Sequence, residues 1–565
     1  MSKKHIIKSA GVIGFATVIS RILGFLRDIL IAKFFGTARY AQAFVVAFRI
    51  PNMLRDLIGE GAANAAFVPV LSEYSETRKK EEFWHLANVL LNVMFIVLAF
   101  VILLGVIFAP IIVRLIAPGF MDDPEKFKIT VYLTRLLFPY VLLVGLLAYC
   151  MGILNSLKHF SAPAFAPAIL NLFIIICALL RQGSVMALAI GVLVGGIIQL
   201  LVQVPVLYKK GFTLFQTSRL VKGEQKFGAG HGFNPPSRNS ASARFSQRRS
   251  KENDFAPVKA WGFNFLSGIY HPAVKKIGRL LVPRILGSCV YQINIFINTM
   301  LASFSSIVGE GGVAALYYAN RIFQFPLAIF GIALAQAALP TMSREALESG
   351  LGNLKKTLSF SIRAVNFIML PASVGLLVLS EPITNMLFER GMFDHYSTII
   401  TAQALSLYSI GLFSYAGIKI LVSCFYSLND TLTPVKVASV SLILNIILSI
   451  IFMFPLKISG LALATSFSGI FNFFFLFFIL RKKIGTIDGV RILRSFLKVF
   501  MASIVMAVII YFSIFKVGLN LFIVISLGIF SYGTAAVIFD VKEAKEFLKW
   551  ALRINYPPSC IKLSK

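Results

Sequence analysis

The chain has 565 residues, of which 57% are hydrophobic and only 14% charged, and its mean hydropathy is +0.81. A water-soluble domain cannot bury that much apolar surface, so the composition excludes a soluble enzyme and predicts an all-α integral membrane protein. The net charge of +31 would suggest nucleic acid in a soluble protein; in a membrane chain its meaning depends on which side of the membrane the charges lie.

Apolar stretches long enough to cross about 30 Å of hydrocarbon recur along the whole chain. They predict about fourteen transmembrane helices, at 9–34, 41–71, 84–117, 127–156, 164–181, 185–208, 273–306, 312–341, 355–380, 399–427, 433–455, 459–481, 494–515 and 518–540. The first stretch contains arginines and has no small-residue cleavage site, so it is predicted to be a span and not a removable signal peptide.

Lysine and arginine gather on one side of this predicted topology. About 35 of them fall in the loops and tails of that side and about seven on the other, a bias that marks cytoplasmic loops. Both termini are therefore predicted to be cytoplasmic. The charge would also attract anionic membrane lipids, and no nucleic-acid partner is expected.

The first predicted span carries charge near its centre. Arg21 lies twelve residues past Ser9, about 18 Å into the span at 1.5 Å per residue, which is too deep for its side chain to reach the surface easily. Arg27 and Asp28 follow on the same helix. Charges at such depth are costly and by default mark a functional site.

Further cations lie in the second and eighth predicted spans, with few acids to balance them. One interpretation is structural, in which the arginines pair with acids or satisfy carbonyls at helix kinks. The other is a positive cavity for an anion, because the planar guanidinium donates two hydrogen bonds to a phosphate and does not deprotonate. The candidate binding residues are Arg21, Arg27, Asp28, Arg49, Arg55, Glu60 and Arg321, and the candidate hinges or kinks are Gly24, Pro51 and Pro326.

The chain also repeats itself. "RILG" occurs at 21–24 and 284–287, "VPVLSE" at 68–73 corresponds to "LPTMSR" at 339–344, and Asn171 corresponds to Asn445. The offset contains six predicted spans, an even number, so the two halves have the same orientation, as in transporters whose substrate site lies between two bundles. The predicted domains are a six-helix lobe at 1–208, a cytoplasmic linker at 209–272, a second six-helix lobe at 273–483, two additional helices at 484–540 and a cytoplasmic tail at 541–565.

The linker and the remaining motifs do not indicate a catalytic, metal or cofactor site. Residues 217–258 are rich in Ser, Arg, Asn and Gly, which predicts a disordered insertion. The five cysteines form no CxxC pair and the six histidines no HExxH motif, so neither a metal site nor a cofactor is expected. No nucleophile–base pair or phosphate-binding glycine loop is visible, so the chain is not expected to be an enzyme.

Three segments carry a family resemblance: "SRILGFLRD" (20–28), "AFRIPNMLRDL" (47–57) and "YYANRIFQFPLAIFGIALAQAALPTMSRE" (317–345). They resemble the MurJ/MviN lipid II flippases of bacterial cell-wall synthesis, and the likeness covers nearly the whole chain apart from 217–258 and about the last twenty residues. The resemblance implies the MOP superfamily fold, with two lobes around a V-shaped central cavity and two extra helices that form a groove for a polyprenyl tail. It also implies that Arg21, Arg27, Arg55 and Arg321 are cavity arginines.

The function implied by this resemblance is transport of undecaprenyl-diphosphate-linked peptidoglycan precursor (lipid II) from the cytoplasmic to the outer leaflet of the bacterial inner membrane, by alternating access. Enzymes of cell-wall synthesis are candidate partners. Gln42 stands where many members are expected to have an acid, so pairing with a neighbouring cation is expected to be lost. Two alternatives remain open: another MOP-type exporter, of polysaccharide-linked lipids or drugs, and a membrane enzyme acting on polyprenyl phosphates.

Overall fold

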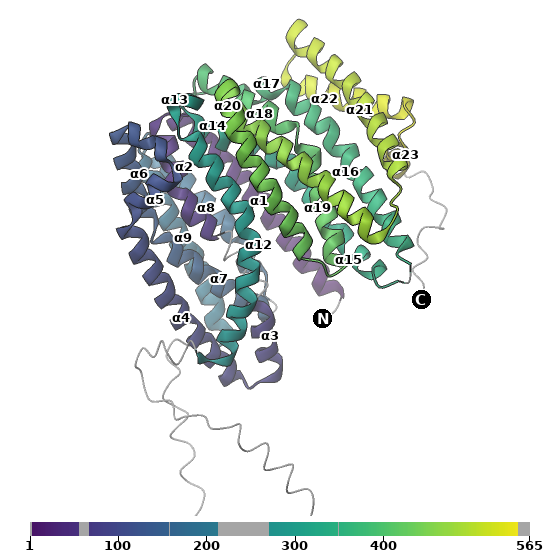
Figure 1. Ribbon diagram of the computed structural model, residues 1–565. Helices are drawn as coiled ribbons and strands as arrows, with labels where there is room; N and C mark the ends of the chain where they lie inside the picture. The colour runs from purple at the N-terminus through teal and green to yellow at the C-terminus, as the bar shows by residue number, and fades with distance from the viewer. Residues whose placement is uncertain (1–2, 56–66, 158, 213–269, 349, 552–565) are drawn as a thin grey trace, which may run out of the picture.

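The computed structural model describes residues 3–55, 67–157, 159–212, 270–348 and 350–551, and within these ranges every regular element is helical. The predicted insertion at 217–258 and the candidate residue Glu60 lie outside the described residues. The helices form two lobes in chain order, the first drawn in purple and blue and the second in teal and green (Figure 1).

The first lobe contains α1 (Lys3–Phe35), α2 (Arg39–Arg55), α3 (Val68–Thr77), α4 (Lys80–Ile107), α5 (Ala109–Ile116), the short 3-10 helix η2 (Pro118–Asp122), α6 (Pro124–Leu137), α7 (Tyr140–Ser156), α8 (Ser161–Leu180) and α9 (Val185–Lys209). The second lobe contains α12 (Pro272–Ala302), α13 (Ser305–Val308), α14 (Gly312–Pro326), the π-helical turn η3 (Leu327–Ile332), α15 (Ala333–Glu345), α16 (Gly352–Val378), α17 (Ser380–Phe388), α18 (His395–Ser409), α19 (Leu412–Ser427) and α20 (Leu432–Ile484).

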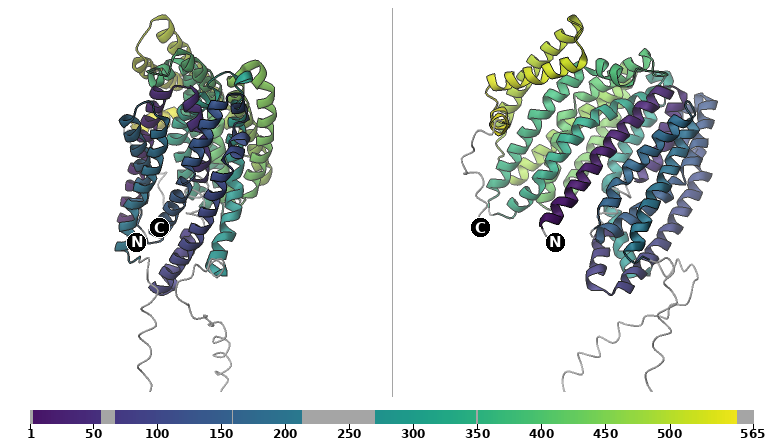
Figure 2. Two further views of the ribbon diagram at one scale, coloured as in Figure 1. Left: turned by 90° about the vertical axis from the view of Figure 1, so that its left-hand side faces the viewer. Right: turned by 180° about the vertical axis from the view of Figure 1, so that it is seen from behind.

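Three further helices, α21 (Gly489–Tyr511), α22 (Leu521–Ile538) and α23 (Lys542–Ala551), lie at the outer edge of the second lobe, away from the first (Figures 1 and 2). A second π-helical turn, η4 (Phe512–Lys516), follows α21. The tail predicted at 541–565 thus begins with a helix. Arg363 of α16 forms a buried ion pair with Glu543 of α23, which attaches this helix to the lobe.

Nine described helices are long and apolar enough to cross a membrane, or ten if the bent pair α18–α19 is one span. The predicted stretches fall largely on described helices, except that 41–71 includes residues 56–66, which lie outside the described residues. The exact number of spans remains a prediction.

The 53-residue helix α20 contains a reversal at Lys457, whose backbone is not helical (φ 51°, ψ −132°). Asn445 Nδ2 donates hydrogen bonds to Thr465 Oγ1 at 3.3 Å and to Ser468 Oγ at 3.4 Å. In a straight helix, residues 20 positions apart would be about 30 Å apart. The chain therefore turns back at Lys457 into two antiparallel arms, which match the predicted spans 433–455 and 459–481.

The predicted kink residues behave differently from one another. Pro326 is the last residue of α14, and the π-helical turn that follows it loosens the helix there. Pro51 lies inside α2, and Gly24 lies inside the unbroken helix α1.

The two lobes contact each other mainly at one end of the molecule, which we call the far end: the end at which α1 finishes. There, Thr37 Oγ1 lies 2.8 Å from Ser397 Oγ, and Met392 N donates to the Lys33 carbonyl at 2.8 Å. Tyr318 of α14 also donates to the Gly36 carbonyl at 3.2 Å. These buried contacts close the space between the lobes at the far end.

Helix α12 belongs to both lobes. At its start, Ala273 and Ile277 pack into a core cluster with first-lobe residues that include Leu71 and Trp84. Its other half packs against α20 in the second lobe, where Asn298 Nδ2 donates to Thr465 Oγ1 at 3.3 Å. The helix thus crosses from one lobe to the other.

Candidate functional site

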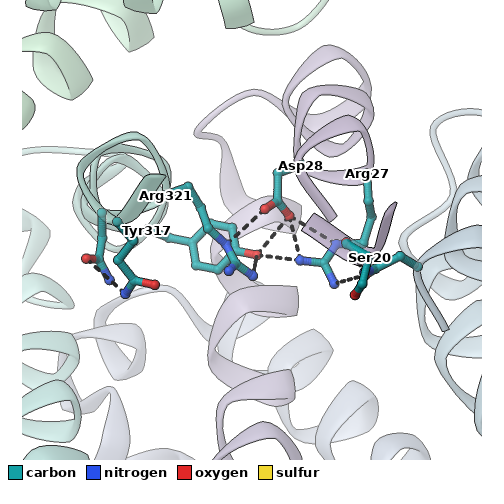
Figure 3. A network of polar contacts seen from close by, with 8 residues as sticks. Ser20, Arg27, Asp28, Tyr317 and Arg321 are labelled. Atoms are coloured by element: carbon teal, nitrogen blue, oxygen red, sulfur yellow. Dashed lines mark hydrogen bonds and ion pairs between the residues drawn. The ribbon is translucent and has the colours of Figure 1, made fainter. Parts of the chain in front are cut away.

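An ionic network centred on the buried Asp28 joins α1 of the first lobe to α14 of the second (Figure 3). Asp28, whose side chain is 1% exposed, accepts hydrogen bonds at Oδ1 from Arg27 Nε at 3.0 Å and Nη2 at 2.8 Å. Its other oxygen, Oδ2, lies 2.9 Å from Arg321 Nε. One carboxylate therefore balances two guanidinium groups across the boundary between the lobes.

Tyr317 completes this network. Its hydroxyl donates to Asp28 Oδ1 at 2.9 Å and accepts from Arg27 Nη2 and Arg321 Nη2, both at 3.2 Å. The Arg321 guanidinium also lies over the Tyr317 ring, 5.1 Å from its centroid. We call Arg27, Asp28, Tyr317 and Arg321 the Asp28 network.

Asn171 of α8 holds Arg27 from the opposite side. Its Oδ1 accepts from Arg27 Nη1 at 2.9 Å, and its Nδ2 donates to the carbonyl of Ser20 at 3.1 Å. Gly24 lies between these two contacts, where an added Cβ would be 3.3 Å from Asn171 Nδ2. The absence of a side chain at Gly24 therefore lets α8 approach α1 closely enough to make both bonds.

A cavity of about 430 Å³ lies beside the network, between the second lobe and the first two helices. Among the described residues, its wall contains three cations, Arg21 of α1, Arg49 of α2 and Lys419 of α19, and no Asp or Glu. The other polar side chains are amides, hydroxyls and phenols: Asn294, Asn298, Thr299, Asn320, Gln324, Ser441, Thr465, Ser468, Asn472, Tyr291, Tyr317, Tyr408 and Tyr415.

This arrangement can bind an anion. The two arginines of the Asp28 network share a carboxylate, whereas Arg21, Arg49 and Lys419 form no ion pair with any residue that the structure describes. Arg49 Nε is buried without a hydrogen-bond partner among these residues. Uncompensated cations inside a low-dielectric wall attract and orient an anionic group, and the surrounding amides can donate further hydrogen bonds to it.

The predicted site residues are thus brought together only in part. Arg21 and Arg49 line the cavity, while Arg27, Asp28 and Arg321 form the adjacent network. Arg55, at the end of α2, is not part of the described cavity wall.

Two residues that the sequence reasoning missed are Lys419 and Tyr317. Lys419 lies well inside the predicted span 399–427, so, like Arg21, it could have been recognised as a charge deep in a membrane helix. Tyr317 gave no such signal, because its role depends on partners about 290 positions away.

The expectation for Gln42 was wrong. Its Oε1 accepts a hydrogen bond from the buried ammonium of Lys126 at 3.2 Å, and its amide nitrogen, Nε2, donates to the Thr37 carbonyl at 3.1 Å. An amide oxygen can accept from a cation as a carboxylate does, so a contact with a neighbouring cation is kept without the negative charge.

Metal-ligating side chains do not cluster in the described parts of the chain, where no group of three His, Cys, Asp or Glu could hold an ion.

The lipid II flippase MurJ family model matches residues 31–532. The chain belongs to this family. It is 32% identical over 518 residues to the probable lipid II flippase MurJ of Buchnera aphidicola subsp. Acyrthosiphon pisum (strain APS), covering 91% of this chain and 90% of the relative. It is also 32% identical over 495 residues to the lipid II flippase MurJ of Burkholderia cenocepacia, covering 87% of each.

Solved structures agree with this assignment. A lipid II flippase MurJ in an inward closed conformation superposes with a TM-score of 0.73 at 26% identity, covering 95% of this chain and 99% of that one. An inward-facing MATE multidrug transporter of the MOP superfamily matches with a TM-score of 0.59 at 15% identity, covering 83% and 96%, and so shares the fold. The predicted fold class, an all-α membrane bundle of MurJ and MOP type, is confirmed.

Proposed function

We propose that this chain transports lipid II, the undecaprenyl-diphosphate-linked disaccharide peptide, across the bacterial inner membrane for cell-wall synthesis. Membership of the MurJ family supports this proposal, and the cavity supplies its chemistry: three cations and no acid in the described wall. A diphosphate is the part of lipid II that such a wall would bind, because arginine donates to phosphate oxygens in pairs.

Transport by alternating access follows from how the lobes meet. With both termini in the cytoplasm, as the distribution of basic residues favours, the far end faces the outer side. The contacts of Thr37 with Ser397 and of Met392 with Lys33 would then close the cavity to the outside. The headgroup would enter from the cytoplasm and leave after the far end opens, while the polyprenyl tail stays in lipid along α21 and α22.

No covalent step is part of this proposal. The side chains bind, orient and release an anion, and the lobes move around it. The Asp28 network lies at the boundary between the lobes and would hold α1 against α14 in the arrangement seen here.

The test of this function is complementation by Arg21 variants in a strain depleted of its own flippase. We expect depletion to accumulate lipid II and the wild-type chain to relieve it. Arg21→Ala should abolish growth, because losing charged hydrogen bonds of about 1.5–3 kcal/mol each weakens binding roughly ten- to hundredfold. Arg21→Lys should be impaired too, since a point charge replaces a two-pronged donor.

Arg181→Ala is the matched control, because Arg181 is exposed at the end of α8 and outside the cavity. It should complement fully. A correctly inserted Arg21→Ala protein that still supports growth would contradict the role of Arg21. Depletion without lipid II accumulation would contradict the substrate.

A further inference from the structure

Lys419 is the one cation that the second lobe contributes to the described cavity wall. It lies near the middle of α19, between residues packed into the core: Ala416 and Ile420 are both fully buried. The Lys419 side chain is nevertheless exposed, and it shares a helix face with Tyr415, another cavity residue four positions earlier. Its exposure therefore comes from the cavity.

No acid of the described residues lines the cavity around this ammonium group. The described cavity wall contains amides, hydroxyls and phenols but neither Asp nor Glu, and Lys419 Nζ makes no ion pair or hydrogen bond with the residues that the structure describes. The Asp28 carboxylate is already shared by Arg27 and Arg321. A lone ammonium in the membrane interior costs free energy, so a structural role does not account for it.

Lys419 lies on the opposite side of the lobe boundary from the other two cavity cations. Arg21 and Arg49 enter the cavity from α1 and α2 of the first lobe, and Lys419 enters it from α19 of the second. An anion in the cavity would therefore be contacted by both lobes. Without an anion, three like charges line one space and repel each other.

We propose that Lys419 is a substrate-binding residue, which holds an anionic group of the transported headgroup from the second lobe. This inference rests on the proposed function. The partner is a phosphate or carboxylate oxygen, since an ammonium is a compact charge that accepts either geometry. The bound headgroup then links the lobes, so that its binding energy is available to the movement between them.

The experiment measures binding of lipid II to the full-length protein in nanodiscs of neutral lipid. Lys419→Met, which keeps the length of the side chain without its charge, should bind lipid II about ten- to hundredfold more weakly than wild type. Lys419→Arg should recover most of the affinity. Lys436→Met is the matched control, because Lys436 is exposed at the start of α20 and outside the cavity wall, and it should bind like wild type.

Thermal unfolding without ligand separates binding from folding. Removing an uncompensated charge from the cavity wall should leave the melting temperature of Lys419→Met unchanged or raise it, while the stabilisation by added lipid II should shrink. A lower melting temperature together with unchanged affinity would show a structural lysine and overturn the proposal.

A second ligand identifies the anionic group. Undecaprenyl diphosphate carries the phosphates without the sugars or the peptide. If Lys419→Met weakens the binding of both ligands, the partner is the diphosphate; if only lipid II is affected, the partner is a carboxylate of the peptide. Equal binding of both ligands by wild type and Lys419→Met would overturn this inference alone, whereas a wild-type protein that binds neither would overturn the proposed function.

Discussion

The carboxylate of Asp28 is buried in a helix of the membrane bundle and forms ion pairs with two arginines, Arg27 and Arg321. A buried ion pair gains little net stability over an apolar replacement, but removing one partner leaves the other charge uncompensated. Arg27 is itself only 6% exposed. Asp28 therefore governs whether both arginines are tolerated.

We expect Asp28→Asn to destabilise the folded protein by about 3–5 kcal/mol, because it removes the carboxylate that balances Arg27. The measurement is thermal unfolding of the purified variant, together with its level in the membrane. Glu125→Gln is the control, since Glu125 pairs with Arg39 at an exposed position, where an ion pair contributes about 0–1 kcal/mol. Equal melting temperatures for Asp28→Asn and wild type would show that the network is dispensable for folding.

At this scale the sequence predicts which residues carry charge at depth but not what they contact. Helical geometry places Arg27 and Asp28 about 100° apart on α1, which suggests different partners. The long guanidinium side chain nevertheless reaches the neighbouring carboxylate. Its other contacts, Asn171 and Tyr317, come from helices 144 and 290 positions away, and nothing local in the sequence specifies them.

Among the elements, α20 shows how one loop residue can fix a helix pair. Asp430 lies in the loop before α20, where its carboxylate accepts from Thr433 N at 3.0 Å and from Thr433 Oγ1 at 2.8 Å. It also accepts from Lys483 Nζ at 2.6 Å, at the end of the second arm. Asp430 thereby ties the start of one arm to the end of the other.

The contribution of these Asp430 contacts to the stability of the folded protein should depend on pH. Partial burial acts to raise the pKa of Asp430, but the bonds from Lys483 and Thr433 outweigh it and lower the pKa from its ordinary 3.8 to about 2. A lowered folded-state pKa contributes stability above the unfolded value, and this contribution is lost as the pH falls from about 4 towards 2. We expect Asp430→Asn to lower the melting temperature at pH 7.

Melting temperatures of wild type and Asp430→Asn, measured from pH 7 downwards, check this prediction. The difference between them should stay constant to about pH 5 and narrow below pH 4. Asp488→Asn serves as the comparison, because Asp488 forms an exposed pair with Arg491. A gap for Asp430→Asn that persists unchanged to pH 3 would show that the carboxylate charge is not its cause.

The positions of the helices could be predicted from the sequence more fully than the contacts between their side chains. Apolar length located both arms of α20 and the turn between them, because a span of hydrocarbon thickness has a fixed number of residues. The helix α23 was missed, since 542–551 is too short and too charged to resemble a span. Its position depends on Glu543, which meets Arg363 of α16 and Ser495 of α21.

For the whole molecule, the far end is the place where the proposed transport cycle requires the lobes to separate. An added Cβ at Gly36 would lie 2.2 Å from the Met392 carbonyl oxygen, and one at Gly391 would lie 2.4 Å from the Lys33 carbonyl oxygen. Both glycines have positive φ, which other residues adopt at a cost. Glycine at these positions allows two backbones to touch directly.

A disulfide across this contact should stop transport. Thr37 and Ser397 have hydroxyl oxygens 2.8 Å apart, close enough for a cysteine pair to form a disulfide. In a background without the native cysteines, we expect Thr37→Cys with Ser397→Cys to lose lipid II transport under oxidising conditions and to regain it with reductant. The measurement is transport of lipid II by the cross-linked and the reduced protein.

The two single cysteine variants are the controls and should transport in both conditions. A fully cross-linked protein that still transports would show that the far end need not open. The repeat in the sequence predicted two lobes correctly, but it could not predict this contact, because the residues that meet there come from unrelated positions of the two halves.

Helix α12 sets a mechanical condition on any such opening. It has 31 residues and a length of about 46 Å, one end embedded in the first lobe and the other packed against the second. Both ends of this one continuous helix are therefore held by packing, each against a different lobe. A rotation between the lobes would therefore have to bend or twist α12, or detach one of its ends.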